Sequence, residues 1–273
     1  MKLAAILVGA GVFLGGAAAL AQPMPARDTA RVMAAGKWRA GLFNPLEIGI
    51  GHGAEVSTSI VPLLSLAPNV AVRVEMGRWG PATITGEYGL AVPTGAMRLL
   101  GGYLFPSFAN GQGEVGWSLV PTAGLWVSGG ERGVLTGRLE TAIGIPLGDT
   151  SVTSLDTYAP VELLFAPTLN GFRTRVGAMY DYGLLDWLRA RAGVSGTLIG
   201  ASPSPPRSPF YFSAEAALEV RLGSYVRVSA GVVYFNSDQR ATEVQTGEDG
   251  FAHRVSVRSN DVFPTFDVIV GSK

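Results

Sequence analysis

The chain has 273 residues, of which 47% are hydrophobic and 15% are charged, with a formal net charge of zero and no cysteine. The lack of cysteine excludes disulfides and a lipid-modified N-terminal cysteine, and the zero net charge gives no electrostatic basis for binding nucleic acid. Soluble domains carry about 25% charged residues, so the low charge and the mean hydropathy of +0.28 favour a protein that contacts membrane lipid.

Residues 1–21 have the pattern of a secretory signal peptide. Lys2 precedes an apolar run from Leu3 to Leu14, and Ala19-Leu20-Ala21 is a small-residue cleavage site. No later apolar run reaches the roughly 18 residues of a membrane helix. We therefore expect export with cleavage of residues 1–21, a polar periplasmic lead-in over residues 22–36, and a single domain over residues 37–273.

From Lys37 onwards, apolar and polar residues alternate with the period of two that is typical of half-buried β-strands. The first stretch, Lys37–Ile50, is read as one strand, or as a small hairpin divided at Pro45, because proline lacks the donor that a strand ladder needs. The remaining expected strands are Glu55–Ser65, Asn69–Gly77, Pro81–Val92, Val115–Val127, Leu135–Ile145, Thr157–Ala166, Phe172–Tyr182, Leu188–Leu198, Phe210–Leu222, Val226–Tyr234 and Asn260–Val270.

The alternation is clearest between Gly171 and Phe235. Several strands there are ten or more residues long, whereas soluble strands are mostly about 5–6 residues and a tilted strand needs roughly 9–11 to cross a bilayer. This length predicts an all-β fold, a single antiparallel up-and-down transmembrane barrel whose apolar face meets lipid and whose polar face lines the lumen. Alternation alone leaves open a soluble secreted β-sandwich, in which the apolar face would be buried.

The connections set the number and direction of the strands. Thr94–Gly113 is expected to be a connection with a helical turn near Ala96–Leu100, and Ser237–Ser259 an exposed loop. About twelve strands result, with fourteen as the alternative, and an even number places both ends in the periplasm. Ala201–Pro209 then lies on the outer side, with the tight turns on the inner side.

One turn resembles a known group of proteins. The run Tyr182-Gly183-Leu184-Leu185-Asp186-Trp187-Leu188-Arg189, followed by Ala192-Gly193-Val194, is similar to the periplasmic turn of Gram-negative outer-membrane barrels, including porin-like barrels of the meta-pathway phenol-degradation group. Gly51–Val56 is a weaker match. The resemblance implies a β-barrel in the outer membrane. The chain departs from that group at its end, Val270-Gly271-Ser272-Lys273, where such barrels usually carry an aromatic residue.

Charged residues at the polar positions of the strands are the candidate lumen-lining groups. Glu215 or Glu219 is expected to pair with Arg227 across neighbouring strands. Arg173, Arg175, Arg189 and Arg191 could attract anions, or the charges could fill the lumen as structural ion pairs. The candidates are Arg73, Glu75, Glu87, Arg138, Glu140, Arg173, Arg175, Asp181, Arg189, Arg191, Glu215, Glu219, Arg221 and Arg227.

The sequence contains no recognisable catalytic or metal-binding set. Its two histidines are His52, in a glycine turn, and His253, in the long segment near Ser256, and neither belongs to a nucleophile motif. We expect no enzyme activity, no metal and no cofactor. The predicted function is a passive channel or transporter in contact with outer-membrane lipid. The alternative is a non-conducting barrel sealed by ion pairs, which meets a partner through Ser237–Ser259.

Overall fold

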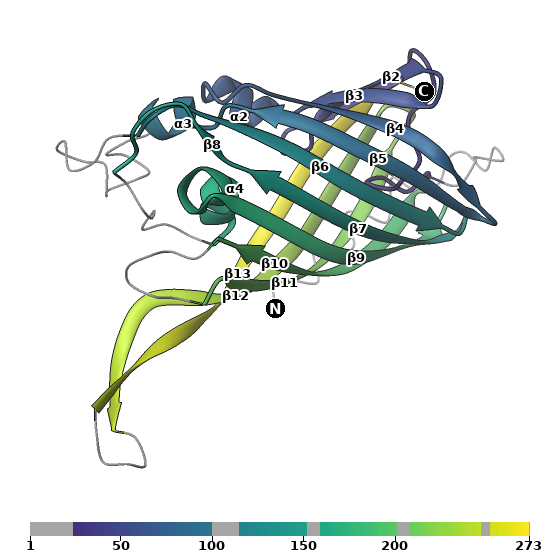
Figure 1. Ribbon diagram of the computed structural model, residues 1–273. Coiled ribbons are helices and arrows are strands. Elements are labelled where there is room, and N and C mark those ends of the chain that lie inside the picture. The colour runs from purple at the N-terminus through teal and green to yellow at the C-terminus, as the bar shows by residue number, and fades with distance from the viewer. Residues whose placement is uncertain (1–23, 100–114, 152–158, 201–207, 247–251, 273) are drawn as a thin grey trace.

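The computed structural model describes residues 24–99, 115–151, 159–200, 208–246 and 252–272, and these fold into one β-barrel (Figure 1). The expected signal peptide, 1–21, and the tip of the expected long loop, 247–251, lie outside the described residues. The barrel strands are β1 (Trp38–Gly41), β2 (Leu46–Gly51), β3 (Ala54–Thr58), β4 (Asn69–Trp79), β5 (Ala82–Ala91), β6 (Ser118–Gly129), β7 (Gly133–Ile143), β9 (Phe172–Leu185), β10 (Leu188–Ile199), β11 (Phe210–Leu222), β12 (Val226–Thr246) and β13 (Ala252–Gly271).

The sheet closes on itself with antiparallel neighbours throughout. Of its thirteen strands, twelve form the ring, which is completed by the β5–β6 and β1–β13 pairings, and the short β8 (Ile145–Pro146) pairs with β6 alone. The predicted twelve-stranded barrel is confirmed, and the alternative of fourteen strands is wrong.

The apolar face of the barrel points outward. Large apolar side chains at alternating positions are exposed, among them Val176 (57%) and Val194 (52%), whereas Asp181 and Arg189, at inward positions of the same two strands, are 5% and 2% exposed. A soluble sandwich would bury the apolar set, so that alternative is wrong. None of the helices in the described residues is long and apolar enough to span a bilayer.

The apolar exterior predicts a cost for a charge placed on it that depends on depth. Leu139 lies near the middle of β7 and is 46% exposed. We expect Leu139→Arg to lower the free energy of unfolding in lipid vesicles by about 2–4 kcal/mol, as for cations at the bilayer midplane, and Leu222→Arg at the end of β11 to cost about 0–1 kcal/mol. Denaturant titration measures both, and equal costs at the two positions would contradict a lipid-facing exterior.

The two ends of the barrel differ. One end carries five tight turns, such as Gly223–Tyr225 between β11 and β12, together with the start of β1 and the end of β13. The other end carries the long connections, with the helices α2 (Ile60–Leu64), α3 (Thr94–Leu99) and α4 (Ala159–Asn170). The predicted helical turn near Ala96–Leu100 is confirmed for residues 96–99, which lie in α3.

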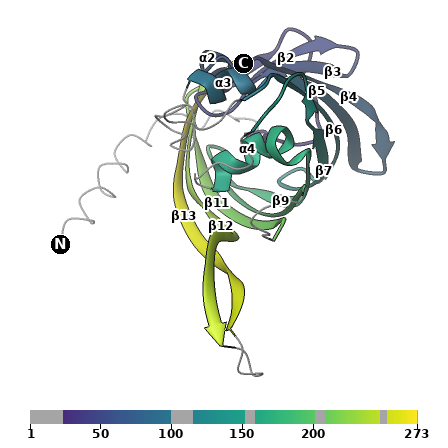
Figure 2. The same ribbon diagram turned by 60° about the vertical axis from the view of Figure 1, so that its left-hand side comes forward.

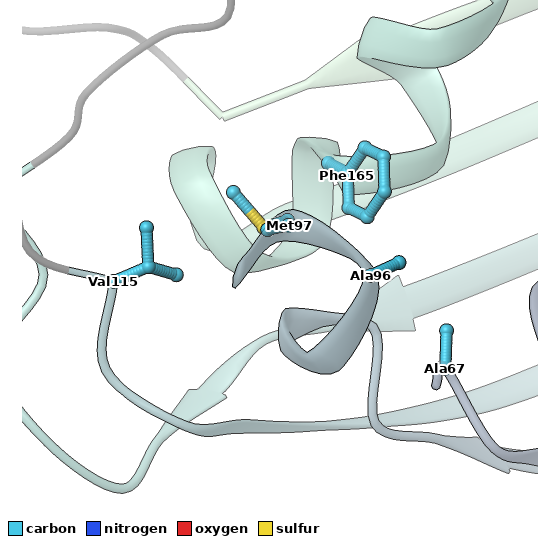
Figure 3. Packing of buried hydrophobic residues seen from close by; sticks show 5 residues of the cluster. All are labelled: Ala67, Ala96, Met97, Val115 and Phe165. Carbon is cyan, nitrogen blue, oxygen red and sulfur yellow. The ribbon is translucent and has the colours of Figure 1, made fainter. Parts of the chain in front are cut away.

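Helices α3 and α4, together with the connections beside them, form a small apolar core at the long-loop end. Ala67, Ala96, Met97, Val115 and Phe165 pack together there (Figure 3). On its other side, α4 buries Ala159 and Ala166 against Ile199 of β10 and Tyr211 of β11. Because Ile199 and Tyr211 are on the buried, inward positions of their strands, α4 lies within the mouth of the ring, as Figure 2 also shows.

Lys37–Ile50 is not one strand, and the alternative of a small hairpin divided at Pro45 is confirmed, because the chain reverses at residues 42–45 between β1 and β2. Three sequence predictions of elements are wrong. Glu55–Ser65 ends as a strand at Thr58, and its second half is α2. Thr157–Ala166 is not a strand, because its described part lies in α4, where Leu163, Leu164, Phe165 and Ala166 are consecutive apolar residues without alternation. Ser237–Ser259 is not a loop, because β12 and β13 continue through its described parts as a hairpin beyond the barrel (Figure 1).

Candidate functional site

Residues 24–36, which the sequence places ahead of the barrel as a polar lead-in, lie inside its lumen; we call them the lumen segment. Met24 and Ala30 are 1% and 0% exposed, and Arg27 and Thr29 are also buried. The segment contacts β10 to β12 at its start and β3 to β6 further on, and these are opposite walls of the ring. It therefore crosses the lumen near the tight-turn end before joining β1.

Arginines of the wall hold the first half of the segment. The guanidinium of Arg189 donates to the carbonyl of Met24 (2.6 Å), and that of Arg227 donates to the carbonyl of Pro25 (3.0 Å). Arg191 donates both to the carbonyl of Arg27 (2.9 Å) and to a carboxylate oxygen of Asp28 (2.6 Å). The carbonyl groups of the segment thus find donors without a neighbouring strand.

Side chains of the lumen segment also bind residues of the barrel wall. The guanidinium of Arg27 forms a buried ion pair with Glu219 and donates to the hydroxyl of Ser229 (3.2 Å). Glu219 also pairs with Arg227 at 3.1 Å, so the predicted Glu219–Arg227 pair is confirmed.

The second half of the segment is bound to the opposite wall. The backbone N–H of Ala30 donates to Ser128 (2.7 Å), and its carbonyl accepts from Thr85. The guanidinium of Arg73 donates to the carbonyl of Thr29 (3.1 Å), and the N–H of Met33 donates to Glu55 (2.7 Å). These bonds fix the segment across the full width of the barrel.

The Asp28 carboxylate contributes to this attachment over a wide pH range. Burial alone would raise its pKa, but Arg191, Arg27 and Arg39 lower it more, so the pKa lies well below the ordinary value of 3.8. Because the pKa is lowered in the folded state, the stabilisation is present above the ordinary pKa and is lost only as the pH falls below it.

The segment divides the lumen into two parts. On the tight-turn side lies a cavity of about 1190 Å³ lined by Met24, Pro25, Arg31 and Val32. On the other side lies a cavity of about 760 Å³ lined by Arg27 and Asp28; we call it the central cavity.

An apolar cavity adjoins the central cavity at the long-loop end. It has a volume of about 510 Å³ and is lined by α2, α3 and α4, with Val61, Val161 and Phe165 among its side chains. Glu87 and Glu140 line both spaces, so the two cavities are neighbours.

The structure distributes the fourteen candidate residues over the three cavities, the binding site of the lumen segment and the rim of the barrel. Those lining the central cavity are Arg73, Glu87, Arg138, Glu140, Arg175, Arg191 and Glu215. Arg173 lines the apolar cavity, and Glu75 lines the tight-turn cavity. Arg189, Glu219 and Arg227 bind the lumen segment directly, and Asp181 pairs with Arg189 and Arg191. Arg221 lies at the tight-turn rim and donates to the carbonyl of Asp186 (2.8 Å).

Three of the four arginines expected to attract anions are paired with carboxylates. Arg173 pairs with Glu140 at 2.5 Å, Arg189 with Asp181, and Arg191 with Asp28. Arg175 has no ion pair within 4.0 Å among the described residues, and its Nε donates to Ser195 (3.1 Å). The four therefore do not form one patch.

The candidates omitted several charged groups that the structure brings into the lumen, among them Asp267 of β13, which lines the central cavity. Glu47, Glu55 and Arg39 occupy inward positions of β1 to β3, where Glu47 pairs with Arg39 and Arg73, and Glu55 with Arg73. The odd-numbered alternation in Lys37–Ile50 carries Arg39 and Glu47, so that signal could have found them. Arg27 and Asp28 lie in a stretch without periodicity, which gave no signal. The described residues contain no group of three His, Cys, Asp or Glu side chains placed to hold a metal ion.

Comparisons with known proteins give a likeness of fold. No family model and no curated protein matches the chain. Outer-membrane expressed OmpT of Vibrio cholerae is similar over 84% of this chain and 64% of its own, with 11% identity and a TM-score of 0.42. A Pseudomonas aeruginosa FadL homologue is similar over 85% and 67%, with 12% identity and a TM-score of 0.40.

The chain thus spans about two thirds of the length of these two proteins. At these scores no residue role or substrate passes from either to this chain, and no match supports the narrower resemblance to the phenol-degradation group. The closed ring, the apolar exterior and the charged lumen of the chain itself are those of an outer-membrane β-barrel.

Proposed function

We propose that the protein is an outer-membrane channel or transporter for small solutes, with the lumen segment as its barrier. The observation that carries this proposal is the succession of spaces along the lumen: the apolar cavity, the central cavity and the tight-turn cavity. Lumen cavities with charged walls are the means by which barrels select solutes. The resemblance of Tyr182–Arg189 to the periplasmic turn of outer-membrane barrels supports the location of this lumen in the outer membrane.

The direction of the path follows from the length of the connections. In bacterial barrels the short turns face the periplasm and the long loops face outward. The end with α2, α3 and α4 is accordingly the outer end, and the lumen segment lies on the periplasmic side. A solute from outside would meet the apolar cavity first, then the central cavity, and then the segment.

A non-conducting barrel is the second candidate, because many lumen charges are paired. Arg27, Arg39, Arg73, Arg173, Arg189, Arg191 and Arg227 each have a carboxylate partner. The hairpin of β12 and β13 extends beyond the barrel and offers a surface to a partner (Figure 1). In that case the lumen segment and the ion pairs would keep the lumen closed permanently.

Planar-bilayer conductance of two refolded proteins decides between the candidates. One is the chain from Gln22 to the C-terminus, and the other starts at Gly36, so that it keeps the Gly36–Gly49 backbone bond and lacks the rest of the segment. We expect the longer chain to conduct little and the shorter chain to show stable steps, because the cavities on either side of the segment then join.

Two controls make the result interpretable. Both proteins should migrate faster in unheated than in heated gel samples, which shows that the barrel has formed. A synthetic peptide of residues 22–35, added to the shorter chain, should lower its conductance. A folded shorter chain that carries no current would overturn the proposal in favour of the non-conducting barrel.

A further inference from the structure

The inner wall built by β7 and β9 carries two guanidinium groups that face the central cavity without a carboxylate partner. Among the described residues, no carboxylate oxygen lies within 4.0 Å of a nitrogen of Arg138 or Arg175, and both side chains are half-buried. Arg175 donates to the Ser195 hydroxyl (3.1 Å), and the Arg138 guanidinium lies 5.5 Å from the centre of the Trp126 ring. Removing a cation from water without a counter-ion is costly, so such a pair is unusual in a lumen otherwise rich in ion pairs.

The strand register brings the two groups together. Glu140 of β7 is opposite Arg175 of β9, and Arg138 is opposite Gly177. Arg138 and Arg175 are therefore diagonal neighbours on the same face of adjacent strands, a spacing that long side chains bridge. A single planar anion can contact both guanidinium groups.

Glycines open a recess in the wall beside the two arginines. A Cβ atom at Gly177 would lie 3.1 Å from the Cβ of Ser195 and 3.6 Å from Nε of Arg138, so a side chain there would occupy the space. The recess has a volume of about 20 Å³ and is lined by Arg138, Arg175, Ser195, Ser213 and Glu215. That volume holds about one water-sized group.

The charges beside the recess limit the ligand to one negative charge. The arginines there are Arg138, Arg173 and Arg175, and the carboxylates are Glu140 and Glu215 of β11, of which Glu140 is already paired with Arg173. Asp181, further along β9, is paired with Arg189 and Arg191. One positive charge is left in excess, while Glu215 at the recess repels a second negative charge. The ion-paired cluster on the opposite wall has the opposite balance, with three carboxylates to two arginines; these are Glu47, Glu55, Glu87, Arg39 and Arg73.

We propose that Arg138 and Arg175 bind the carboxylate of a small organic acid whose apolar body extends into the adjoining apolar cavity. Arginine pairs with carboxylates through two parallel N–H bonds, and Val61, Val161 and Phe165 provide apolar contacts for the rest of the molecule. This inference rests on the proposed function, since the acid would reach the site along the same lumen, and it names the class of solute.

Equilibrium dialysis of the detergent-solubilised chain from Gln22 tests the site with three probes of similar size: benzoate, benzamide and benzylamine, which is a cation at neutral pH. We expect the protein to bind benzoate more tightly than benzamide. The double variant R138Q/R175Q should weaken benzoate binding at least about tenfold, the usual effect of losing a hydrogen bond to a charged group, and should leave benzamide binding unchanged.

The variants should fold, because neither arginine has a carboxylate that would be left unpaired. If the double variant does not fold, the single variants R138Q and R175Q test the site instead. Each should bind benzoate more weakly than the unaltered chain. Arg78→Gln at the tight-turn rim, where the side chain is 72% exposed, removes the same charge outside the central cavity and should leave benzoate binding unchanged.

Equal binding of benzoate and benzamide by the unaltered chain, or benzoate binding that R138Q/R175Q does not weaken, would overturn the inference. Tighter binding of benzylamine would also overturn it and assign the site to Glu215. Equilibrium dialysis measures binding and requires no transport through the barrel. If the chain binds benzoate but its shortened form carries no current, the proposed function is contradicted and the carboxylate site is still supported.

Discussion

Replacing Gly49 with valine is expected to displace the lumen segment and to open the barrel without shortening the chain. Gly49 lies on the inward face of β2, and a Cβ atom there would overlap the carbonyl oxygens of Met33 and Ala34. The backbone of the segment cannot give way by rotating a side chain, so the segment has to leave the wall. Overpacking of this kind typically costs about 1–3 kcal/mol, enough to change strongly the population of the docked segment.

Two measurements detect the displacement of the lumen segment. Bilayer conductance should rise toward that of the chain starting at Gly36. The protein has no cysteine, so Ala30→Cys introduces a single thiol at a position that is 0% exposed. A polar maleimide should label this thiol slowly in the otherwise unaltered chain and at least about tenfold faster when Gly49→Val is added, as expected for a shift of 1.4 kcal/mol or more.

Gly137→Val is the matched control. Gly137 is in β7, and a Cβ atom there meets no atom within 4 Å. The same substitution should therefore change neither the conductance nor the labelling. Slow labelling in the Gly49→Val protein would show that the segment tolerates the added side chain, and would contradict the close backbone approach as its means of docking.

Arg73→Met is expected to cause a large loss of stability. Arg73 is 4% exposed, and its guanidinium contacts Glu55, Glu47 (3.3 Å) and Glu87 (3.8 Å), as well as the carbonyl of Thr29. Methionine keeps much of the apolar stem and removes the charge. Breaking a buried ion pair by removing one partner costs about 3–5 kcal/mol, because the carboxylates stay buried with less counter-charge.

Denaturant unfolding in lipid vesicles measures this loss, and a second substitution separates charge from packing. In the double variant R73M/E55Q one carboxylate is removed with its partner, so the double variant should be less destabilised than the sum of the two single variants. Additive effects would show that the loss arises from packing alone. Arg73→Lys should recover part of the stability, since an ammonium group cannot bind Glu55 and the carbonyl of Thr29 through one planar fork.

The predicted number of strands is correct, although two of the elements behind it are wrong. Lys37–Ile50 was counted as one strand and forms two, and Thr157–Ala166 was counted as a strand, whereas its described part lies in α4. The two errors offset each other. Both arose where alternation was weak or interrupted: Pro45 stands at the chain reversal between β1 and β2, and consecutive apolar residues from Leu163 to Ala166 have no period of two.

The sequence alone predicted the all-β class of fold and, within most strands, which residues share a face. These are local properties, because successive side chains of a strand alternate between its faces wherever the strand pairs. Runs such as Phe172–Tyr182 therefore identified the charged interior and the apolar exterior.

Only the tertiary structure decided which lumen charges are paired and what fills the lumen. Arg27 and Glu219 are 192 positions apart, and Ala30 and Ser128 are 98 positions apart, so no local pattern connects them. The lumen segment has no periodicity, because its backbone is bound by side chains of the wall and not by a neighbouring strand. The unpaired state of Arg138 and Arg175 likewise follows from strand register and from Gly177, which become visible only once the ring is closed.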